Sequence, residues 1–135
     1  MNYYNEIKNK LIDNEIYSKV KDYSKERHRV ITYFEIGKLL YEAGSKYGEN
    51  IIDEYSEKLV VDVGKKYNSR TLRSMRQLYK TFNDDFWKPL VSKLSWTSFL
   101  LIMPLKDKNE MYYYSNQCIN YNLSKRQLQE KIKSN

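Results

Sequence analysis

The sequence predicts an all-α fold, a compact multi-helix bundle with a helix-turn-helix-like unit around residues 49–82. Apolar residues recur every three or four positions along most of the chain, which is the period of an amphipathic helix. Only four glycines and two prolines interrupt the 135 residues, which leaves little material for the many turns of an all-β domain. Ser, Asp and Asn residues stand directly before several periodic segments, where they can cap helices.

Three helices are expected in the first half of the chain. Apolar positions predict a short first helix over residues 3–12, with Asp13 and Asn14 as a break or a new cap. The period then continues over residues 15–43, which predicts one long helix that Gly44 ends. A third helix is expected over residues 49–63, with its apolar positions on one side and acidic residues on the other.

The second half begins with a less regular segment. Residues 84–93 contain Pro89 and show little periodicity, so we expect a loop there. Its large apolar residues are expected to pack back onto the domain: Phe86, Trp87 and Leu90. Ser95 is expected to cap a short core helix that ends at Pro104, with Leu100 and Met103 among its apolar positions.

Capping patterns predict two further helices near the C-terminus. Asp107 and Glu110 are expected to form a capping box for a helix that reaches about Tyr121. Ser124 with Gln127 fits the start of the last helix. The sequence therefore contains helix starts and stops from one end to the other, and we expect residues 1–135 to form a single helical domain.

Composition limits the class of protein. The single Cys118 excludes an internal disulfide and any zinc site with several cysteines, which fits a reducing compartment. No apolar run approaches the ~20 residues of a transmembrane helix, and the N-terminal MNYYNEIKNK lacks the apolar core of a signal peptide. We therefore expect a soluble, cytoplasmic protein with no membrane partner.

Positive charge is concentrated in one segment. Residues 1–62 carry 10 cations and 12 acids, residues 63–83 carry 6 cations and no acid, and residues 84–135 carry 8 cations and 5 acids. A local excess of this kind is the electrostatic footprint of a nucleic-acid contact. The expected partner is therefore a polyanion.

The basic segment is expected to form a helix from about Arg70 to Phe82, capped by Ser69. One side of this helix is apolar: Leu72, Met75, Leu78, Tyr79 and Phe82. The other side and the preceding turn supply the predicted nucleic-acid-binding residues: Lys65, Lys66, Arg70, Arg73, Arg76, Gln77 and Lys80. The cations are expected to meet phosphates, with Arg73 or Gln77 reaching base edges. The alternative is a basic face that only meets solvent.

The sequence predicts no catalytic site, metal site or cofactor. The acids at positions 53, 54 and 57 are expected to form an ordinary outer helix surface, because lysines are abundant nearby. Glu6-Ile7-Lys8 has the E-x-K form of a nuclease motif, but no acidic partner strand precedes it. His28 has no cysteine nearby and is expected to be structural or solvated. The tyrosines at 112–114 are expected on three sides of one partly buried helix.

Segments between residues 30 and 135 resemble one bacterial protein family. They are YFEIGKLL at 33–40, YG at 47–48, YSEKL at 55–59, VGKKYNSRTLRSMRQLY at 63–79, LSW at 94–96 and YNLSKRQLQEKI at 121–132. In this order and spacing they resemble the N-terminal domain of YhcG-type PDDEXK nucleases. The resemblance implies a helical, DNA-binding or helix-turn-helix-like module that precedes a nuclease domain. Because it continues to Asn135, we expect this chain to be the N-terminal part of a longer protein.

The chain departs from the family pattern at three places. Lys66 stands where the family usually has a second glycine, and it adds charge to the turn while restricting the backbone. Thr97-Ser98 follow LSW in place of a Ser-His pair, and Leu123-Ser124 replace an aromatic-Ser pair. No predicted role depends on the missing histidine.

Two functions follow from the sequence. The first is a DNA-binding module, non-catalytic by itself, that delivers an attached nuclease to double-stranded DNA. The second is a protein-interaction or dimerisation module of a defence or mobile-element system, with the tyrosine-rich surface as its contact. Salt separates the two, because affinity that rests on phosphate contacts falls steeply with ionic strength.

Overall fold

The computed structural model describes residues 2–19, 25–85 and 87–134, and every regular element in these ranges is a helix. The predicted all-α class is therefore confirmed. None of the described helices combines the length and the apolar character that crossing a bilayer requires. The helices are α1 (Tyr3–Ser18), α2 (Lys25–Tyr47), α3 (Asn50–Asp62), α4 (Ser69–Phe82), α5 (Lys88–Val91), α6 (Trp96–Ile102), α7 (Lys108–Tyr121) and α8 (Lys125–Lys133).

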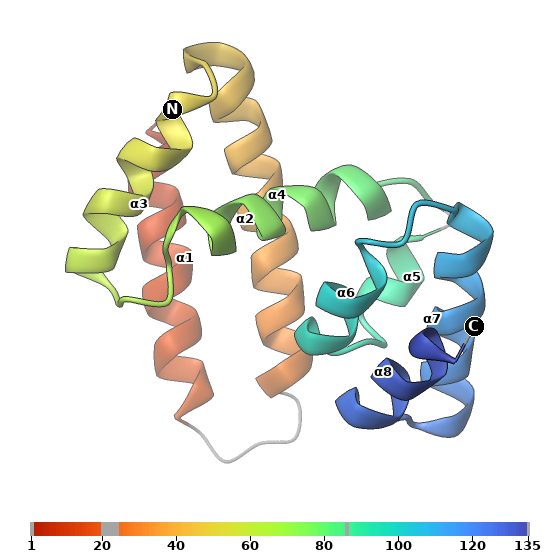
Figure 1. The fold of residues 1–135 in the computed structure, drawn as a ribbon. Helices are drawn as coiled ribbons and strands as arrows, with labels where there is room; N and C mark the ends of the chain where they lie inside the picture. The colour runs from red at the N-terminus through yellow and green to blue at the C-terminus, as the bar shows by residue number, and fades with distance from the viewer. Residues whose placement is uncertain (1, 20–24, 86, 135) are drawn as a thin grey trace.

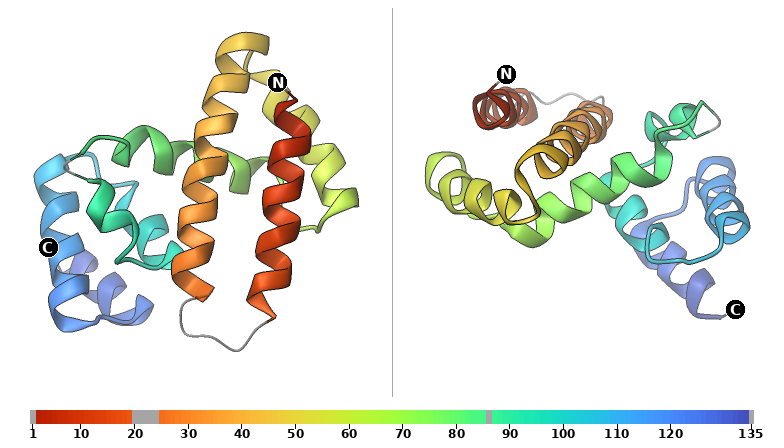
Figure 2. Two further views of the ribbon diagram at one scale, coloured as in Figure 1. Left: turned by 180° about the vertical axis from the view of Figure 1, so that it is seen from behind. Right: turned by 90° about the horizontal axis from the view of Figure 1, so that it is seen from above.

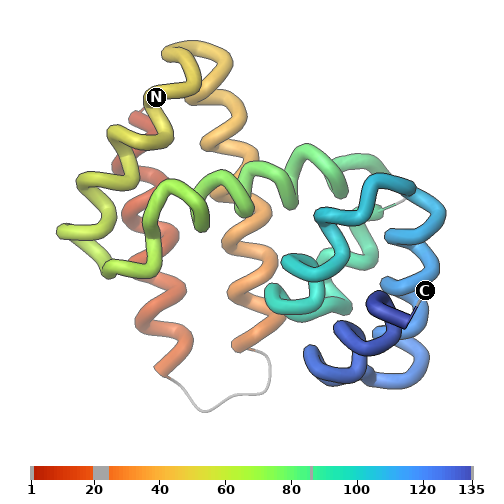
Figure 3. Tube along the Cα trace, in the orientation of Figure 1, coloured from red at the N-terminus to blue at the C-terminus, as the bar shows by residue number. Residues whose placement is uncertain are grey.

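Helix α4 joins two groups of helices. Helices α1, α2 and α3 lie on one side of the molecule, and α5 to α8 gather on the other (Figure 1). The view from above shows α4 running past α2 towards the C-terminal group (Figure 2). The tube drawing shows α1 and α2 as an antiparallel pair behind α4 (Figure 3). One hydrophobic core cluster extends through both groups.

Helix α1 is longer than predicted. It continues to Ser18 instead of ending after residue 12. Asn14 is buried at 2% exposure, and its Oδ1 lies 2.9 Å from Nδ1 of His28 on α2. The predicted break at Asp13 and Asn14 is wrong, because a partner on another helix satisfies the amide that a break would have exposed. His28 also stacks on Tyr17 at 4.0 Å, which makes it a structural residue as expected.

The long helix predicted over residues 15–43 is wrong at both ends. Residue 15 belongs to α1, and α2 begins at Lys25; residues 20–24 lie outside the described ranges. At the other end, Gly44 lies inside α2, which continues to the residue before Gly48. Gly48 has a φ of +94°, a left-handed conformation that glycine adopts without strain. The glycine that ends the helix is therefore Gly48.

Helices α2 and α4 cross in close contact at Gly37, which is buried. A Cβ atom placed on Gly37 would lie 2.1 Å from the carbonyl oxygen of Met75 and 3.0 Å from Cβ of Tyr79. Only a residue without a side chain allows two helix backbones to approach this closely. The crossing fixes which side of α4 faces the core.

Aromatic rings connect α4 to the C-terminal helices. Phe82, at the end of α4, packs edge-on against Trp87 and Phe99, with 5.1 Å between ring centroids in each pair. Trp96 at the start of α6 makes a similar contact with Tyr33 of α2, at 5.0 Å. Edge-to-face pairs of this kind add to the stabilisation from burial alone. The C-terminal group is therefore tied to both α4 and α2.

The segment 84–93 is more regular than predicted. It contains the short helix α5, with Pro89 in the first turn, where the missing N–H costs no hydrogen bond. The expectation of a loop is therefore wrong for α5. Trp87 and Leu90 are buried as predicted. Phe86, which was expected to pack beside them, lies outside the described residues.

The predicted cap residues of the last three helices are confirmed. Ser95 accepts a backbone hydrogen bond at the start of α6, and Asp107 accepts one from Asn109 at the start of α7. The predicted capping box of Asp107 with Glu110 is wrong, because Asp107 bonds to the residue before Glu110. Ser124 and Gln127 form the capping box of α8, with hydrogen bonds of 3.2 and 2.8 Å. Asn122, between α7 and α8, adopts a left-handed conformation with a φ of 49°. These local interactions fix where each helix begins.

Substitution of Gly37 tests the close crossing of α2 and α4. We expect Gly37→Ala to lower the free energy of unfolding by about 1–3 kcal/mol, because the added methyl group must push the helices apart. Gly44→Ala is the matched control on the same helix, since the atom nearest to the added Cβ is Nη1 of Arg76 at 3.8 Å. The control is expected to gain up to about 1 kcal/mol from helix propensity. Urea unfolding followed by circular dichroism measures both, and equal stability of the two variants would contradict the close crossing.

Candidate nucleic-acid interface

Helix α4 buries one side in the core. Asn68, not the predicted Ser69, caps the helix by accepting a hydrogen bond from the N–H of Thr71 at 3.0 Å. Tyr79 is partly buried against two aromatic rings of α2. The other apolar residues are fully buried, as the helical period predicted: Leu72, Met75, Leu78 and Phe82. The polar side of α4 therefore faces outward.

The outward side of α4 meets Asp53 of α3 and Glu49, the residue just before α3, which the charge count along the sequence did not reveal. Arg73 donates from Nη1 and Nη2 to the two carboxylate oxygens of Asp53 at 3.0 and 3.2 Å. Its Nε donates to Glu49 at 3.2 Å. The Ser69 hydroxyl donates to Asp53 at 2.6 Å. Asp53 was expected on an ordinary outer surface, but it is an anchor between α3 and α4.

A second arginine of α4 shares one of these acids. Arg76 donates from Nη1 and Nη2 to the two carboxylate oxygens of Glu49 at 2.6 and 3.0 Å. The hydrogen bonds from Arg76 and Arg73 lower the pKa of Glu49 from 4.5 to about 2. The bonds from Arg73 and Ser69 also lower the pKa of Asp53, and the acids in turn raise the pKa of Arg73. These forked pairs orient α4 against α3, although solvent screening limits their energy.

The turn before α4 is held against α1. Tyr67 is fully buried, and its hydroxyl donates to a carboxylate oxygen of Glu15. The same carboxylate lies 2.7 Å from Nζ of Lys66. Burial raises the pKa of Glu15, but the hydrogen bonds from Lys66 and Tyr67 lower it overall. Burial and the bond to Glu15 both raise the pKa of Tyr67.

The seven predicted binding residues divide into three sets. Some form ion pairs within the chain: Lys66, Arg73 and Arg76. Others are exposed cations that pair with no acid in the described ranges: Lys65, Arg70 and Lys80. Gln77 is exposed, and its side-chain amide donates to the hydroxyl of Thr81 at 3.0 Å. The structure therefore leaves fewer cations for a partner than the sequence count implied.

A groove runs beside the outward side of α4. It is lined by Ser69, Arg70, Arg73, Ser74 and Gln77 of α4 and by Leu100, Met103 and Pro104 at the end of α6. Sequence reasoning missed Ser74 and assigned Leu100 and Met103 to the core, but Leu100 is 38% exposed. Leu100 follows the buried Phe99, and successive residues of a helix point about 100° apart. The helical period of the sequence could therefore have placed Leu100 away from the core. The groove combines polar groups of α4 with an aliphatic wall.

The other candidate groups of the sequence lie apart from this groove. Glu6 is exposed on α1, and Lys8 pairs with Asp62 at 3.6 Å. Cys118 is buried on α7, and burial raises its pKa. In the part of the chain that the structure describes, no three His, Cys, Asp or Glu side chains gather closely enough to hold a metal ion.

The low pKa of Glu49 makes stability depend on pH. The folded state holds this carboxyl ionised down to about pH 2, whereas its ordinary pKa is 4.5. The stabilisation is therefore complete above about pH 4.5 and is lost as the pH falls towards 2. We expect the free energy of unfolding to fall less between pH 7 and pH 3 in Glu49→Gln than in the parent, as measured by urea unfolding. Glu57→Gln, at an exposed position of α3, should follow the parent, and an equal fall in all three proteins would contradict the pairing.

Comparison with known proteins places these features in a family. No curated protein and no solved structure matches the chain. A family model, the DUF1016 N-terminal domain, matches residues 8–135, a range that includes α4, its leading turn and the groove. The resemblance noted in the sequence is thereby confirmed. The chain belongs to the family of DUF1016 N-terminal domains, which are YhcG-like.

Proposed function

We propose that this chain is a module that binds double-stranded DNA, is non-catalytic by itself, and serves a PDDEXK-type nuclease in the cytoplasm. Membership of the DUF1016 family suggests a domain of a PDDEXK-type protein. The DNA-binding part rests on one observation, the exposed cations on α4 and its leading turn: Lys65, Arg70 and Lys80. Cations with no competing acid are available to replace the counterions of a phosphate backbone.

The roles of the seven predicted residues follow from their contacts. Arg73 and Arg76 donate hydrogen bonds to Glu49 and Asp53. They therefore orient α4 instead of contacting the DNA. Gln77 remains the residue placed to read a base edge, since it is exposed in the groove and carries both a donor and an acceptor. The exposed cations supply affinity without sequence preference.

The arrangement of α3 and α4 supports a helix-turn-helix-like binding mode. The helices are consecutive and in contact, with residues 63–68 between them. This connection is longer than the usual three or four residues. The buried Tyr67 holds it in place, and the second helix presents its polar side outward, as a recognition helix must. The non-catalytic part of the proposal is supported by the use of the α3 acids as partners of arginines.

An interaction module is the second candidate, and exposed tyrosines of α7 favour it. Tyr112 and Tyr113 are 44% and 51% exposed, and Tyr121 is 68% exposed, whereas Tyr114 is buried. This is the partly buried helix that the sequence predicted for residues 112–114. Tyrosine is enriched at protein interfaces, so these exposed tyrosines of α7 fit contact with a second copy or another protein. Binding of that kind should change little with salt.

Neutralising the exposed cations tests the proposed function. The variant Lys65→Gln, Arg70→Gln, Lys80→Gln should keep the parent's helicity and stability, because exposed substitutions usually cost within ~0.5 kcal/mol each. It should bind a mixed-sequence DNA duplex more weakly. If three phosphate contacts are lost, the slope of log K against log salt should flatten by about 2.7, at about 0.9 per contact. Fluorescence anisotropy over a salt series measures the slope.

A matched control removes the same charge elsewhere. Three exposed cations lie near the end of α1 and the start of α2, and none of them lines the groove beside α4: Lys19, Lys25 and Arg27. Replacing these three by Gln should leave the salt slope close to that of the parent. If both triple variants weaken binding equally, net charge alone drives it and α4 has no special role. If the parent itself binds no duplex, the proposal is wrong, and self-association of α7 tyrosine variants becomes the measurement of interest.

A further inference from the structure

Excess positive charge lies in two parts of the chain, and α4 accounts for only one. Residues 84–124 carry four cations and four acids, so they are neutral overall. Helix α8 carries four cations, Lys125, Arg126, Lys131 and Lys133, with Glu130 as its one acid. All of the positive excess that follows α4 in the sequence is therefore concentrated on this short last helix.

Helix α8 holds its cations on a fixed backbone. Leu128 is fully buried and docks the helix, while the capping box fixes its start. The side chain of Arg126 is 89% exposed, and its ion pair with Glu130 at 3.6 Å is exposed on both sides. Such a pair contributes little and can open readily. The cations of α8 are thus presented to solvent, in contrast to the forked arginine pairs of α4.

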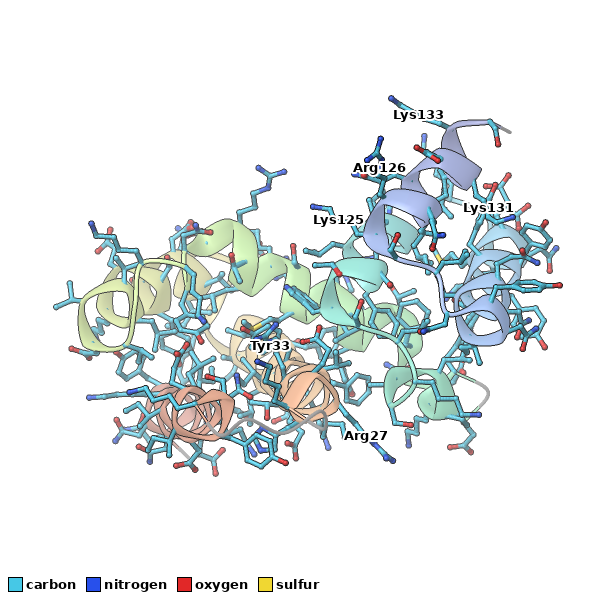
Figure 4. All side chains as sticks on the ribbon, turned by 90° about the horizontal axis from the view of Figure 1, so that it is seen from below. Arg27, Tyr33, Lys125, Arg126, Lys131 and Lys133 are labelled. Carbon is cyan, nitrogen blue, oxygen red and sulfur yellow. The ribbon has the colours of Figure 1, made fainter. Side chains whose placement is uncertain are left out.

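Figure 4 shows how these cations are distributed around α8. Lys125, Arg126 and Lys133 lie along one edge of the helix, whereas Lys131 lies on the side towards α7. Arg27 of α2 points away at the opposite edge of the molecule. Three of the four cations therefore form one line, which we call the α8 line: Lys125, Arg126 and Lys133.

The α8 line is continuous with the surface of α4 across α6. Helix α6 packs against α8, and Leu101 of α6 lines a groove with Arg126 and Lys133. The neighbouring residue Leu100 lines the groove of α4 with Arg70. Two consecutive residues of α6 thus each line one of the two grooves. A ligand lying across α6 would meet α4 on one side and α8 on the other.

We propose that α8 is a second phosphate-binding element, and that α4 and the α8 line contact two stretches of backbone on one DNA duplex, with α6 between them. This inference rests on the proposed function and extends it. Residues 125 and 133 are about 12 Å apart along a helix axis, at 1.5 Å per residue. Over about 12 Å of its axis, one DNA strand presents three or four phosphates. The length of the line suits its three cations.

The lining of the two grooves favours a duplex over a single strand. Proteins that bind single strands commonly stack the bases on aromatic side chains. The grooves beside α4 and α8 are lined by charged, polar and aliphatic residues, and none of the lining residues is aromatic. Two separate lines of cations match the two backbones that a duplex presents, whereas a single strand needs one.

The test neutralises the α8 line in the whole chain. We expect Lys125→Gln, Arg126→Gln, Lys133→Gln to flatten the slope of log K against log salt for a long mixed-sequence duplex by about 2.7, at about 0.9 per lost contact. A duplex of about 10 base pairs is one helical turn long. The parent should bind it more weakly than the long duplex. The α8 variant should show a smaller difference between the two duplexes, because it no longer uses the additional length of the long one. Circular dichroism confirms that helicity is retained.

Two further variants separate charge from structure. The charge-preserving variant Lys125→Arg, Arg126→Lys, Lys133→Arg should bind like the parent, even if the neutral variant proves less stable. Lys131→Gln, on the side of α8 that faces α7, should leave the salt slope close to the parent's. If Lys131→Gln weakens duplex binding as much as a single Gln substitution at each position of the α8 line, the proposed line is wrong.

The outcomes for α8 and for α4 are distinguishable. If the variant at Lys65, Arg70 and Lys80 loses affinity while the α8 variant binds like the parent, α8 is not a contact and the proposed function stands. If the α4 variant and the α8 variant both show a flatter slope of log K against log salt than the parent, a binding surface made of both helices is supported. If the parent binds only single-stranded DNA, or no nucleic acid, the duplex surface is wrong altogether.

Discussion

The direction of every side chain on α4 depends on the backbone contact with α2 at Gly37. Because Gly37 has no side chain, α4 lies directly against α2, with its apolar residues inward. Its polar side must then face outward. The same placement brings Phe82 to Trp87 and Phe99, and through them to the C-terminal helices. One glycine therefore sets both the exposed side of α4 and the place where α6, and with it α8, joins the molecule.

The acids of α3 change what the basic helix can do. The basic segment contains no acid of its own, but Glu49 and Asp53 reach its arginines from the neighbouring helix. A guanidinium that donates two or three of its five N–H groups to carboxylates has much of its charge offset by them, which weakens its attraction to a phosphate. These arginines therefore hold α3 and α4 together, while the exposed cations have no acidic partner among the described residues. A local charge count overestimates the charge a surface presents whenever a neighbouring element supplies the counter-charge.

The same contrast explains what could be predicted from the sequence. Caps such as Ser124 and the apolar side of α4 depend on residues a few positions apart. The local sequence pattern was therefore sufficient to predict them. Asn14 is a residue type that often breaks a helix, but here its side chain pairs with His28 on another helix. The local pattern could not show that pairing. Arg76 and Glu49 are 27 residues apart, and their pairing depends on how α3 folds back on α4. The seven predicted binding residues could be chosen by type and position, but their division into paired and exposed groups required the tertiary structure.

Rigid support of the cations has a consequence for recognition. The turn before α4 is anchored by Tyr67, which is fully buried and bonded to Glu15, and α8 is anchored by Leu128 and its capping box. The proposed binding would then order side chains more than backbone, which would reduce the entropy lost on association. In the proposed complex, cations on two anchored helices would fix the orientation of the domain on the duplex, while carrying no sequence information themselves. Sequence preference would depend on the groove between α4 and the end of α6, which Gln77 lines together with aliphatic residues.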